Sequence, residues 1–344
     1  MSHLVLSEND LACLEVTDAS RSEGLGFFRI LEAESSQWPS YERLFREAFG
    51  SEVSKAVWDY KYGFVDHASL IAFHEDEVAG FYGAIPRRWW MGGELTESLQ
   101  LCDVMVSPRF RGILGRQGLL ARMALRVRDQ KLGSAAKRAF AFGFPNERHL
   151  RLGVKLSLYR EVEHLSEVSW HTGEVKGPRP WVREIGSSSS LSALGDRLWP
   201  EMALDLADFD LGERNGSYLV SRYFQHPTRI YRRYAVFSPW TFRPCALIVL
   251  EVSGKDCRLM DWVAAGESIP LAIKASRMLG GRWGFERVLA WSTQGMLQRI
   301  SRDAVTVAPS GPSLAIMMPE DPKEKKIDPA SRPFWITMGD CDFL

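Results

Sequence analysis

The stretch from Asp103 to Met123 reads DVMVSPRFRGILGRQGLLARM. Its first residues, largely apolar, are typical of a strand that ends before Pro108. Glycines at positions 112, 115 and 118 allow the backbone to turn sharply and to approach a ligand closely. Apolar side chains at helical spacing then predict an amphipathic helix over residues 116–130. Strand, turn, glycine-rich loop and helix in this order indicate an α/β fold with a binding loop.

The start of this helix is suited to bind a phosphate group. Backbone N–H groups between Phe110 and Leu119 would point outward together, with the positive end of the helix dipole behind them. Arg109, Arg111 and Arg116 can add positive charge. A Rossmann site needs G-x-G-x-x-G and a Walker loop needs Gly-Lys-Ser/Thr, and this stretch has neither. We therefore expect a pyrophosphate site, with an ordinary strand-to-helix turn carrying surface arginines as the alternative.

Further strands and helices are predicted on both sides of this stretch from their own periodicity. In the first half, strands are expected at 26–32, 69–73, 78–86, 94–107, 139–144 and 156–170, and helices at 39–49, 53–62 and from the N-cap residue Asn146 onward. In the second half, strands are expected at 246–252, 258–263, 287–291 and 334–338, with a helix at 269–279.

A linker is expected at residues 171–190, HTGEVKGPRPWVREIGSSSS, which are rich in glycine, proline and serine. The two halves on either side echo each other. Leu101-Cys-Asp-Val104 and Leu259-Met-Asp-Trp262 each follow an aromatic helix and a hairpin-like pair of strands. A tandem duplication explains this order. The expected division is a flexible N-terminal segment 1–25, a first domain 26–170, the linker 171–190 and a second domain 191–344.

Composition restricts the class of protein. The 344 residues carry 43 basic and 43 acidic side chains, so no basic surface for nucleic acid is expected. Five scattered cysteines without a CxxC pair argue against a disulfide framework and a zinc site and suit a cytoplasmic protein. No signal peptide and no uncharged apolar stretch long enough to span a bilayer is evident. Among the twelve tryptophans, Trp89 and Trp90 are candidates for an aromatic acceptor cleft, and burial in a core is the alternative.

Three short motifs resemble the GCN5-related N-acetyltransferase (GNAT) superfamily. Val104-Met-Val-Ser-Pro-Arg-Phe-Arg-Gly112 looks like the fourth strand of that family and the entry to its coenzyme A loop. Phe142-Gly-Phe-Pro-Asn146 and Lys155-Leu-Ser-Leu-Tyr159 resemble its fifth strand, its Asn-started helix and the turn that follows. The resemblance covers about residues 26–170 and extends to the second half only in element order. It implies two GNAT-like domains, each a mixed, mostly antiparallel sheet flanked by helices, with splayed central strands.

The resemblance also implies which residues hold the donor. Backbone N–H groups on the fourth strand would hold an acyl-CoA and polarise its carbonyl, the loop would bind the pyrophosphate, and Asn146 would contact the pantetheine unless it only caps its helix. The residues so implied are Val104, Met105, Val106, Arg111, Gly112, Gly115, Arg116, Gln117, Gly118 and Asn146. The loop departs from the family pattern, because counting from Arg111 places Leu114 and Arg116 at the usual glycine positions.

Proton transfer needs a base and an acid. Asp103 is the candidate base, since it lies in an apolar strand beside the expected thioester, where burial would raise its pKa. The alternative is that Asp103 orients a loop, and Glu97 is a weaker base candidate. Many family members place a Tyr acid on the helix after the Asn, but Gly153 stands at that position here. Tyr159 is near in sequence and is expected to point elsewhere.

These features favour an N-acyltransferase that moves an acetyl or other acyl group from acyl-CoA to a primary amine by direct attack. The acceptor is expected to be a small or sugar-like amine or a peptidyl amine, and no metal is expected. The second domain would cover one side of the acceptor cleft or support the first domain. The alternatives are a non-catalytic acyl-CoA-binding regulatory protein and a tRNA-dependent aminoacyl transferase of the two-domain peptidoglycan-bridging type. The sequence leaves the acceptor, the acyl chain length and the oligomeric state open.

Overall fold

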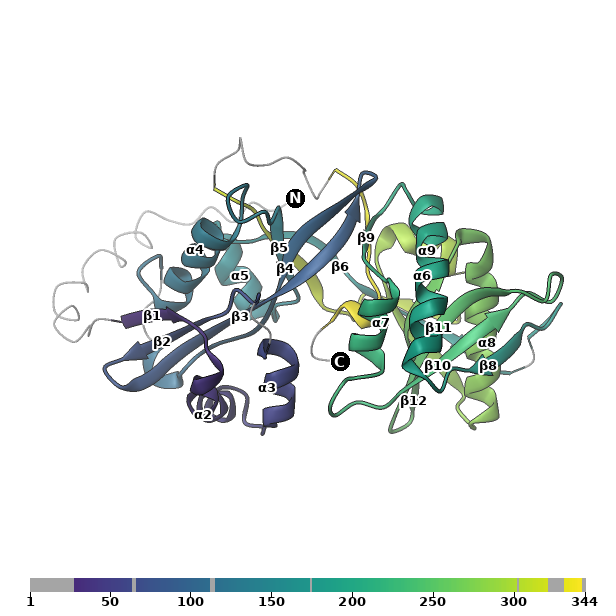
Figure 1. The fold of residues 1–344 in the computed structure, drawn as a ribbon, viewed down its shortest axis with the longest axis horizontal. Helices are drawn as coiled ribbons and strands as arrows, with labels where there is room; N and C mark the ends of the chain where they lie inside the picture. Colours follow the sequence, from purple (N-terminus) through teal and green to yellow (C-terminus); the bar gives the residue numbers. More distant parts are fainter. Residues whose placement is uncertain are drawn as a thin grey trace, which may run out of the picture.

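The computed structural model has two lobes, each built around its own β-sheet (Figure 1). It describes residues 28–63, 66–111, 115–173, 175–301, 303–320 and 331–341. The segment 1–25, expected to be weakly ordered, lies outside these residues. Both lobes place helices on the faces of a mixed sheet, as the resemblance implied.

The first sheet is mostly antiparallel. Its order is β1 (Phe28–Glu32), β2 (Leu70–His74), β3 (Glu77–Met91), β4 (Glu94–Val106), β5 (Phe140–Gly143), β15 (Ser313–Met317) and β6 (Arg160–His164). The central pair β4–β5 is parallel. The long β3 also pairs with β9 (Asp210–Gly212), which pairs in turn with β16 (Phe334–Trp335).

Two pairs of helices cover the first sheet on opposite faces (Figure 1). The helices α2 (Trp38–Phe49) and α3 (Lys55–Tyr62) pack on one face, and α4 (Leu119–Lys131) and α5 (Glu147–Lys155) pack on the other. Local signals set their ends. Gly50 adopts a φ of 69° and ends α2, which suits a residue without a Cβ. Asn146 caps α5 by accepting a hydrogen bond from the backbone N–H of His149 (2.9 Å).

The second sheet repeats the arrangement of the first. Its order is β14 (Thr306–Ala308), β7 (Ser166–His171), β13 (Arg287–Ser292), β12 (Asp256–Ala264), β11 (Pro244–Ser253), β10 (Tyr231–Phe237) and β8 (Trp181–Glu184), with β12–β13 parallel. The helices of this lobe are α6 (Ser188–Asp205), α7 (Gly216–Tyr223), α8 (Ile269–Arg282) and α9 (Gln294–Ile300). Short 3-10 turns lie at Ser35–Gln37, Pro108–Phe110, Gly266–Ser268 and Met338–Asp340.

Each sheet also contains at least one strand from the other half of the chain. β7, from the first half of the sequence, lies between β14 and β13 of the second sheet. β15, from the second half, lies between β5 and β6 of the first sheet. Each lobe therefore completes its sheet with a strand from the other half of the chain.

This exchange does not follow the expected domain boundaries. A division at 170 would assign β7 to the first lobe, although its hydrogen bonds lie in the second sheet. Residues 171–190 are not a linker throughout, because β8 and the start of α6 lie within them. The Gly, Pro and Ser content that suggested a linker belongs mainly to the turns around β8 and to the first turn of α6.

Candidate functional site

A β-bulge interrupts β4 at the residue proposed as the base. Phe81 of β3 pairs with Met105, and Gly83 pairs with Cys102, so Asp103 and Val104 together face Tyr82. Asp103 has a φ of 47°, in the left-handed region that few residues other than glycine adopt. A bulge bends its strand and re-aims the side chains on it. The bulge of β4 therefore lies at Asp103.

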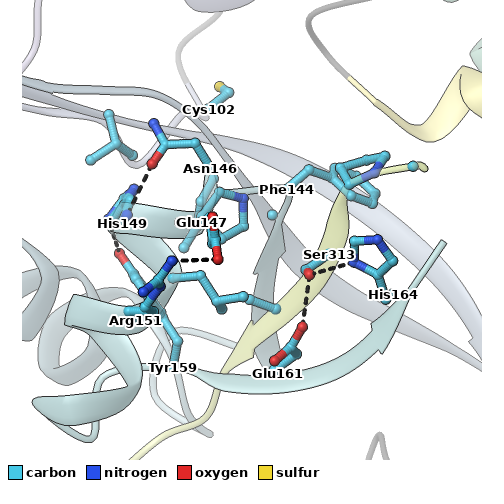
Figure 2. Close-up of a pocket in the computed structure, with 18 of the residues that line it drawn as sticks. Cys102, Phe144, Asn146, Glu147, His149, Arg151, Tyr159, Glu161, His164 and Ser313 are labelled. Carbon is cyan, nitrogen blue, oxygen red and sulfur yellow. Dashed lines mark hydrogen bonds and ion pairs between the residues drawn. The ribbon is translucent and has the colours of Figure 1, made fainter. Parts of the chain in front are cut away.

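Beyond the bulge, β4 and β5 separate and a cavity opens between them. The parallel pairing runs from Ser98 and Phe140 to Leu101 and Gly143, where β5 ends. A cavity of about 800 Å³ lies past this point. Its walls come from the ends of β4 and β5, from α5, and from β6 and β15 (Figure 2). The residues that line it include Leu101, Cys102, Asp103, Val104, Gly143, Phe144, Asn146, His149, Leu150 and Tyr159.

The exchanged strand β15 forms one wall of this cavity. Leu314 pairs with Glu163 and Ala315 with Glu161, so β6 is bulged at Val162. The extra residue brings Glu161 and His164 to the same face of β6, where they flank Ser313 of β15. The Ser313 hydroxyl donates to Glu161 Oε1 (2.7 Å) and lies 3.0 Å from His164 Nδ1 (Figure 2). The second half of the chain thereby contributes residues to the wall of the cavity.

Asp103 lies beside the cavity and is held by three side chains. The hydroxyls of Tyr41 and Tyr62 donate to Asp103 Oδ2 (2.9 and 2.6 Å). The Lys61 ammonium lies 3.1 Å from both carboxylate oxygens. Burial alone would raise the pKa of Asp103, but the Lys61 charge and the hydrogen bonds from Tyr62, Lys61 and Tyr41 outweigh it, and the pKa lies below its ordinary value.

The expectation of a raised pKa for Asp103 was therefore wrong, because the sequence did not reveal which distant side chains would meet this carboxylate. A lowered pKa makes Asp103 a weaker proton acceptor. Its bonds tie α2 and α3 to the bulge instead. Glu97, the weaker base candidate, is exposed on β4 and does not line the cavity.

Tyr159 occupies the position that Gly153 leaves open. A Cβ atom on Gly153 would lie 1.8 Å from Tyr159 Cδ2, so only glycine on this turn of α5 admits the ring. The Tyr159 hydroxyl is 2.6 Å from the Tyr82 hydroxyl. It also lies 3.2 Å from His149 Nε2 (Figure 2). Tyr159 lines the cavity. The expectation that it points elsewhere was wrong, because the chain folds back over α5 after Lys155.

Burial sets the protonation states of Tyr159 and His149. Burial raises the pKa of Tyr159, and the hydrogen bond with Tyr82 opposes that shift. Burial lowers the pKa of His149 to about 4. At neutral pH the phenol therefore keeps its hydrogen, and the imidazole is neutral.

The other strand residues implied in donor binding lie in different surroundings. Val104 lines the cavity, whereas the Met105 side chain is buried in the core beneath α2 and α3. The Val106 carbonyl accepts a hydrogen bond from Arg111 Nε (2.8 Å). Asn146 lines the cavity as well as capping α5.

The loop residues lie before α4 and are not part of the cavity wall. Gly112 lies outside the described residues. Gly115 has a φ of 88°, and Gly118 is the N-cap of α4 and provides no side chain to its first turn. Arg111, Arg116 and Gln117 are exposed. In the described part of the loop, the helix start is thus left without a side-chain cap, as an anion site requires.

The tryptophan pair does not form an acceptor cleft. Trp89 is fully buried, with its ring against Phe142 and Phe334. Trp90 is half-buried against the core of the second lobe. Neither tryptophan lines the cavity between β4 and β5. The hypothesis of an aromatic acceptor cleft at these residues is therefore wrong, and the alternative, burial in a core, is correct.

The second lobe carries a bulge at the corresponding place, on β12, but other parts of the chain cover it. Val249 pairs with Asp261 and Leu250 with Leu259, which bulges β12 at Met260. Asp261 is fully buried, bound to Arg214 Nε (2.8 Å) and to the Tyr223 hydroxyl (2.7 Å). The segment 334–341 packs over it, and a Cβ on Gly339 would lie 1.9 Å from that hydroxyl.

The described residues contain no group of three or more His, Cys, Asp or Glu side chains placed to hold a metal ion. Within those ranges, every helix is too short or too polar to cross a bilayer.

Comparisons with known proteins agree with this architecture. Residues 29–150 match the family described as Acetyltransferase (GNAT) domain. A probable N-acyltransferase from Enterococcus faecalis is 12% identical, with a TM-score of 0.66 over 86% of this chain and 73% of that one. A GCN5-related N-acetyltransferase from Anabaena variabilis is 15% identical, with a TM-score of 0.63 over 84% and 72%. N-myristoyltransferase from Saccharomyces cerevisiae with bound myristoyl-CoA is 10% identical, with a TM-score of 0.55 over 90% and 88%.

At these identities the solved structures establish the fold. No curated protein matches the sequence. The family match covers the part of the chain that contains the bulged β4, the loop and α4. Residues 29–150 are therefore similar to a GNAT acetyltransferase domain, and the whole chain shares the two-lobed fold of these structures.

Proposed function

We propose that the protein is an acyl-CoA-dependent N-acyltransferase that acts on a small or sugar-like primary amine. The observation that carries the proposal is the cavity of about 800 Å³ that opens where β4 and β5 part. It begins at the bulge of β4, where backbone groups are released from the sheet. A thioester arm placed there would have Val104 on one side and Phe144 on the other.

The loop before α4 supports binding of the rest of the donor. The helix begins at Leu119 without a side-chain cap, so its first N–H groups can meet a pyrophosphate. Arg111 and Arg116 are exposed beside this end of the helix and would add charge. The glycines at 115 and 118 keep this approach free of side chains.

Acyl transfer would proceed by direct attack. The neutral amine attacks the thioester carbonyl, a C–N bond forms, and the C–S bond breaks to release the thiolate of coenzyme A. The amine gives up its proton to cavity water, since the pKa of Asp103 is lowered and its oxygens already accept from Lys61, Tyr41 and Tyr62. In this proposal, Asp103 shapes the bulge and holds its carboxylate beside the approaching amine.

Tyr159 would protonate the departing thiolate. It lines the cavity, and its raised pKa keeps the phenol protonated until the thiolate forms. Its ring stands where the resemblance placed a tyrosine on the helix itself, at Gly153. The acid is thus supplied from the turn after α5.

The test is release of free coenzyme A by the purified full-length chain. Acetyl-CoA and longer acyl-CoA thioesters would be offered with a panel of amino sugars, simple alkylamines and peptides. The proposal expects amine-dependent release of coenzyme A and an N-acylated product by mass spectrometry. Binding of acetyl-CoA without transfer to any amine would favour the non-catalytic regulatory alternative. If calorimetry showed no binding of acetyl-CoA, both the N-acyltransferase proposal and the regulatory alternative would be wrong.

A further inference from the structure

A row of four paired residues crosses the sheet along the cavity, from β4 to β6. Leu101 pairs with Gly143, Gly143 with Ala315, and Ala315 with Glu161. All four residues line the cavity. The two in the middle have no side chain or a single methyl group, so an extended molecule can lie across them from the parting of β4 and β5 to β6.

Glu161 stands at the β6 end of this row. The Ser313 hydroxyl donates to its Oε1 (2.7 Å) and also lies against His164 Nδ1 (Figure 2). The other ring nitrogen of His164 bonds the Pro309 carbonyl. In the described part of the chain no donor meets the second oxygen of Glu161, and the side chain is exposed. Oε2 is therefore open to a molecule in the cavity.

The other carboxylates of the cavity already have a cation beside them. Asp103 is bound by Lys61 (3.1 Å), and Glu147 is bound by Arg151 one turn further along α5. Among the described residues, no Lys or Arg lies within ion-pair distance of Glu161. The cavity therefore carries one negative charge that the protein does not match with a Lys or Arg.

We propose that the accepted amine carries a second positive charge, which Glu161 binds while the first amino group attacks the thioester. The inference rests on the proposed function and names its substrate class, a diamine. An ammonium group donates strong hydrogen bonds to a carboxylate, and Oε2 is open to accept one. The second amino group keeps its proton and takes no part in the transfer, so the product is a diamine acylated at one end.

The spacing of the strands sets the length of this acceptor. The thioester would lie between β4 and β5, and the sheet continues from β5 through β15 to β6. Neighbouring strands are about 4.8 Å apart, so roughly 12 Å separates the thioester from Glu161. A contact of about 3 Å at each end leaves roughly 6 Å between the two nitrogens, the length of about four methylene groups.

The test compares diaminobutane, with an amino group at each end, with the aminobutanol that has a hydroxyl at the far end. Release of coenzyme A from acetyl-CoA by the full chain gives kcat/KM for each acceptor. The wild type should prefer the diamine about 10-fold, the low end for a charged hydrogen bond because Glu161 is open to solvent. Glu161→Gln keeps an acceptor for Ser313 but loses the charge. It should lose this preference, with unchanged kcat/KM for aminobutanol.

The matched control is Glu163→Gln. Glu163 has the same charge on the same strand but lies outside the cavity wall, where its carboxylate accepts from the backbone N–H of Gln294. This variant should keep the wild-type preference. If Glu161→Gln melts early, Glu161→Asp is measured, because it keeps the charge but withdraws it by one carbon. Its preference should move to the longer diaminopentane.

Several results would overturn the inference. They are equal kcat/KM for the two acceptors in the wild type, an equal loss for both in Glu161→Gln, and loss of the preference in Glu163→Gln. An unchanged preference for diaminobutane over diaminopentane in Glu161→Asp would also contradict it. Acylation of aminobutanol without preference for the diamine refutes this inference alone. If no amine yields an N-acyl product, the proposed function fails, and this inference fails with it.

Discussion

The two lobes build the same bulge and use it differently. In each, an aspartate beside the bulge accepts a hydrogen bond from a tyrosine on the preceding helix: Tyr62 to Asp103 (2.6 Å) and Tyr223 to Asp261 (2.7 Å). Asp103 lies beside an open cavity. Asp261 is fully buried beneath the segment 334–341. The fold supplies a bulged central strand, and what packs over the bulge decides whether a site remains open.

The two aspartates also differ in the charged groups around them. Asp103 meets Lys61 and two hydroxyls at the edge of the cavity. Asp261 meets a guanidinium, Arg214, that also binds Asp340 (2.7 Å), with all three side chains fully buried. The second bulge is therefore a structural ion-pair network, and the first keeps a carboxylate within reach of a ligand. The predictions below test this division.

The largest effect is expected from producing the two halves of the chain as separate fragments. A fragment of residues 1–177 lacks β15, so β5 loses one of its two neighbouring strands, and the buried Phe140 and Phe142 lose one wall of their core. It should not unfold cooperatively in circular dichroism. Co-expression with residues 178–344 should restore a melting transition. A fragment 1–177 that is monomeric and melts cooperatively would contradict the structural role of the strand exchange.

The next largest effect is expected from removing the cation at the bulge of β12 in the second lobe. Arg214→Met leaves two buried carboxylates, Asp261 and Asp340, without their shared cation, which should cost about 3–5 kcal/mol in the free energy of unfolding. Urea denaturation measures this cost. The KM for acetyl-CoA should stay unchanged under conditions where the variant is folded. A change in that KM without loss of stability would place a ligand in the second lobe.

A smaller loss of stability with a larger loss of rate is expected for Gly153→Ala. The new Cβ would meet the Tyr159 ring, and overpacking of this kind costs about 1–3 kcal/mol. The displaced phenol should lower kcat about 100-fold or more. Val154→Ala on the exposed side of α5 is the matched control. Equal kcat values for the two variants would show that Tyr159 has no part in the transfer.

The smallest effect is expected for Asp103→Asn, whose cost in stability should depend on pH. The pKa of Asp103 is lowered in the folded state, so its contribution is complete above the ordinary value of 3.8 and is lost as the pH falls through the lower folded value. Asp103→Asn should therefore destabilise the chain by about 2 kcal/mol at pH 7, the scale of a charged hydrogen bond. The difference from wild type should shrink at pH 3. A difference that grows on acidification would mean that the pKa is raised.

Local signals in the sequence predicted local structure well. The cap at Asn146, the glycine that ends α2 and the helix after the glycine-rich loop depend on neighbouring residues alone. The similar order of elements in the two halves was also visible, because the pattern Leu-x-Asp recurs on two apolar strands. These features sufficed for the fold class.

Features that depend on distant partners were missed. β7 and β15 alternate like any strand, and nothing in their sequence shows that each pairs in the sheet of the other half. The lowered pKa of Asp103 depends on Tyr41, Lys61 and Tyr62, which are 41 to 62 positions away. Gly153 was the one available signal for Tyr159, because an unexplained glycine in a helix indicates a close approach by another side chain.

The measurement that tests the account most directly is a crystal structure of the full chain soaked with acetyl-CoA. We expect one ligand per chain, with its thioester between the ends of β4 and β5, beside Val104, and its pyrophosphate at the start of α4. Density beside Asp261 in the second lobe, or a donor bound away from the parting of β4 and β5, would contradict it.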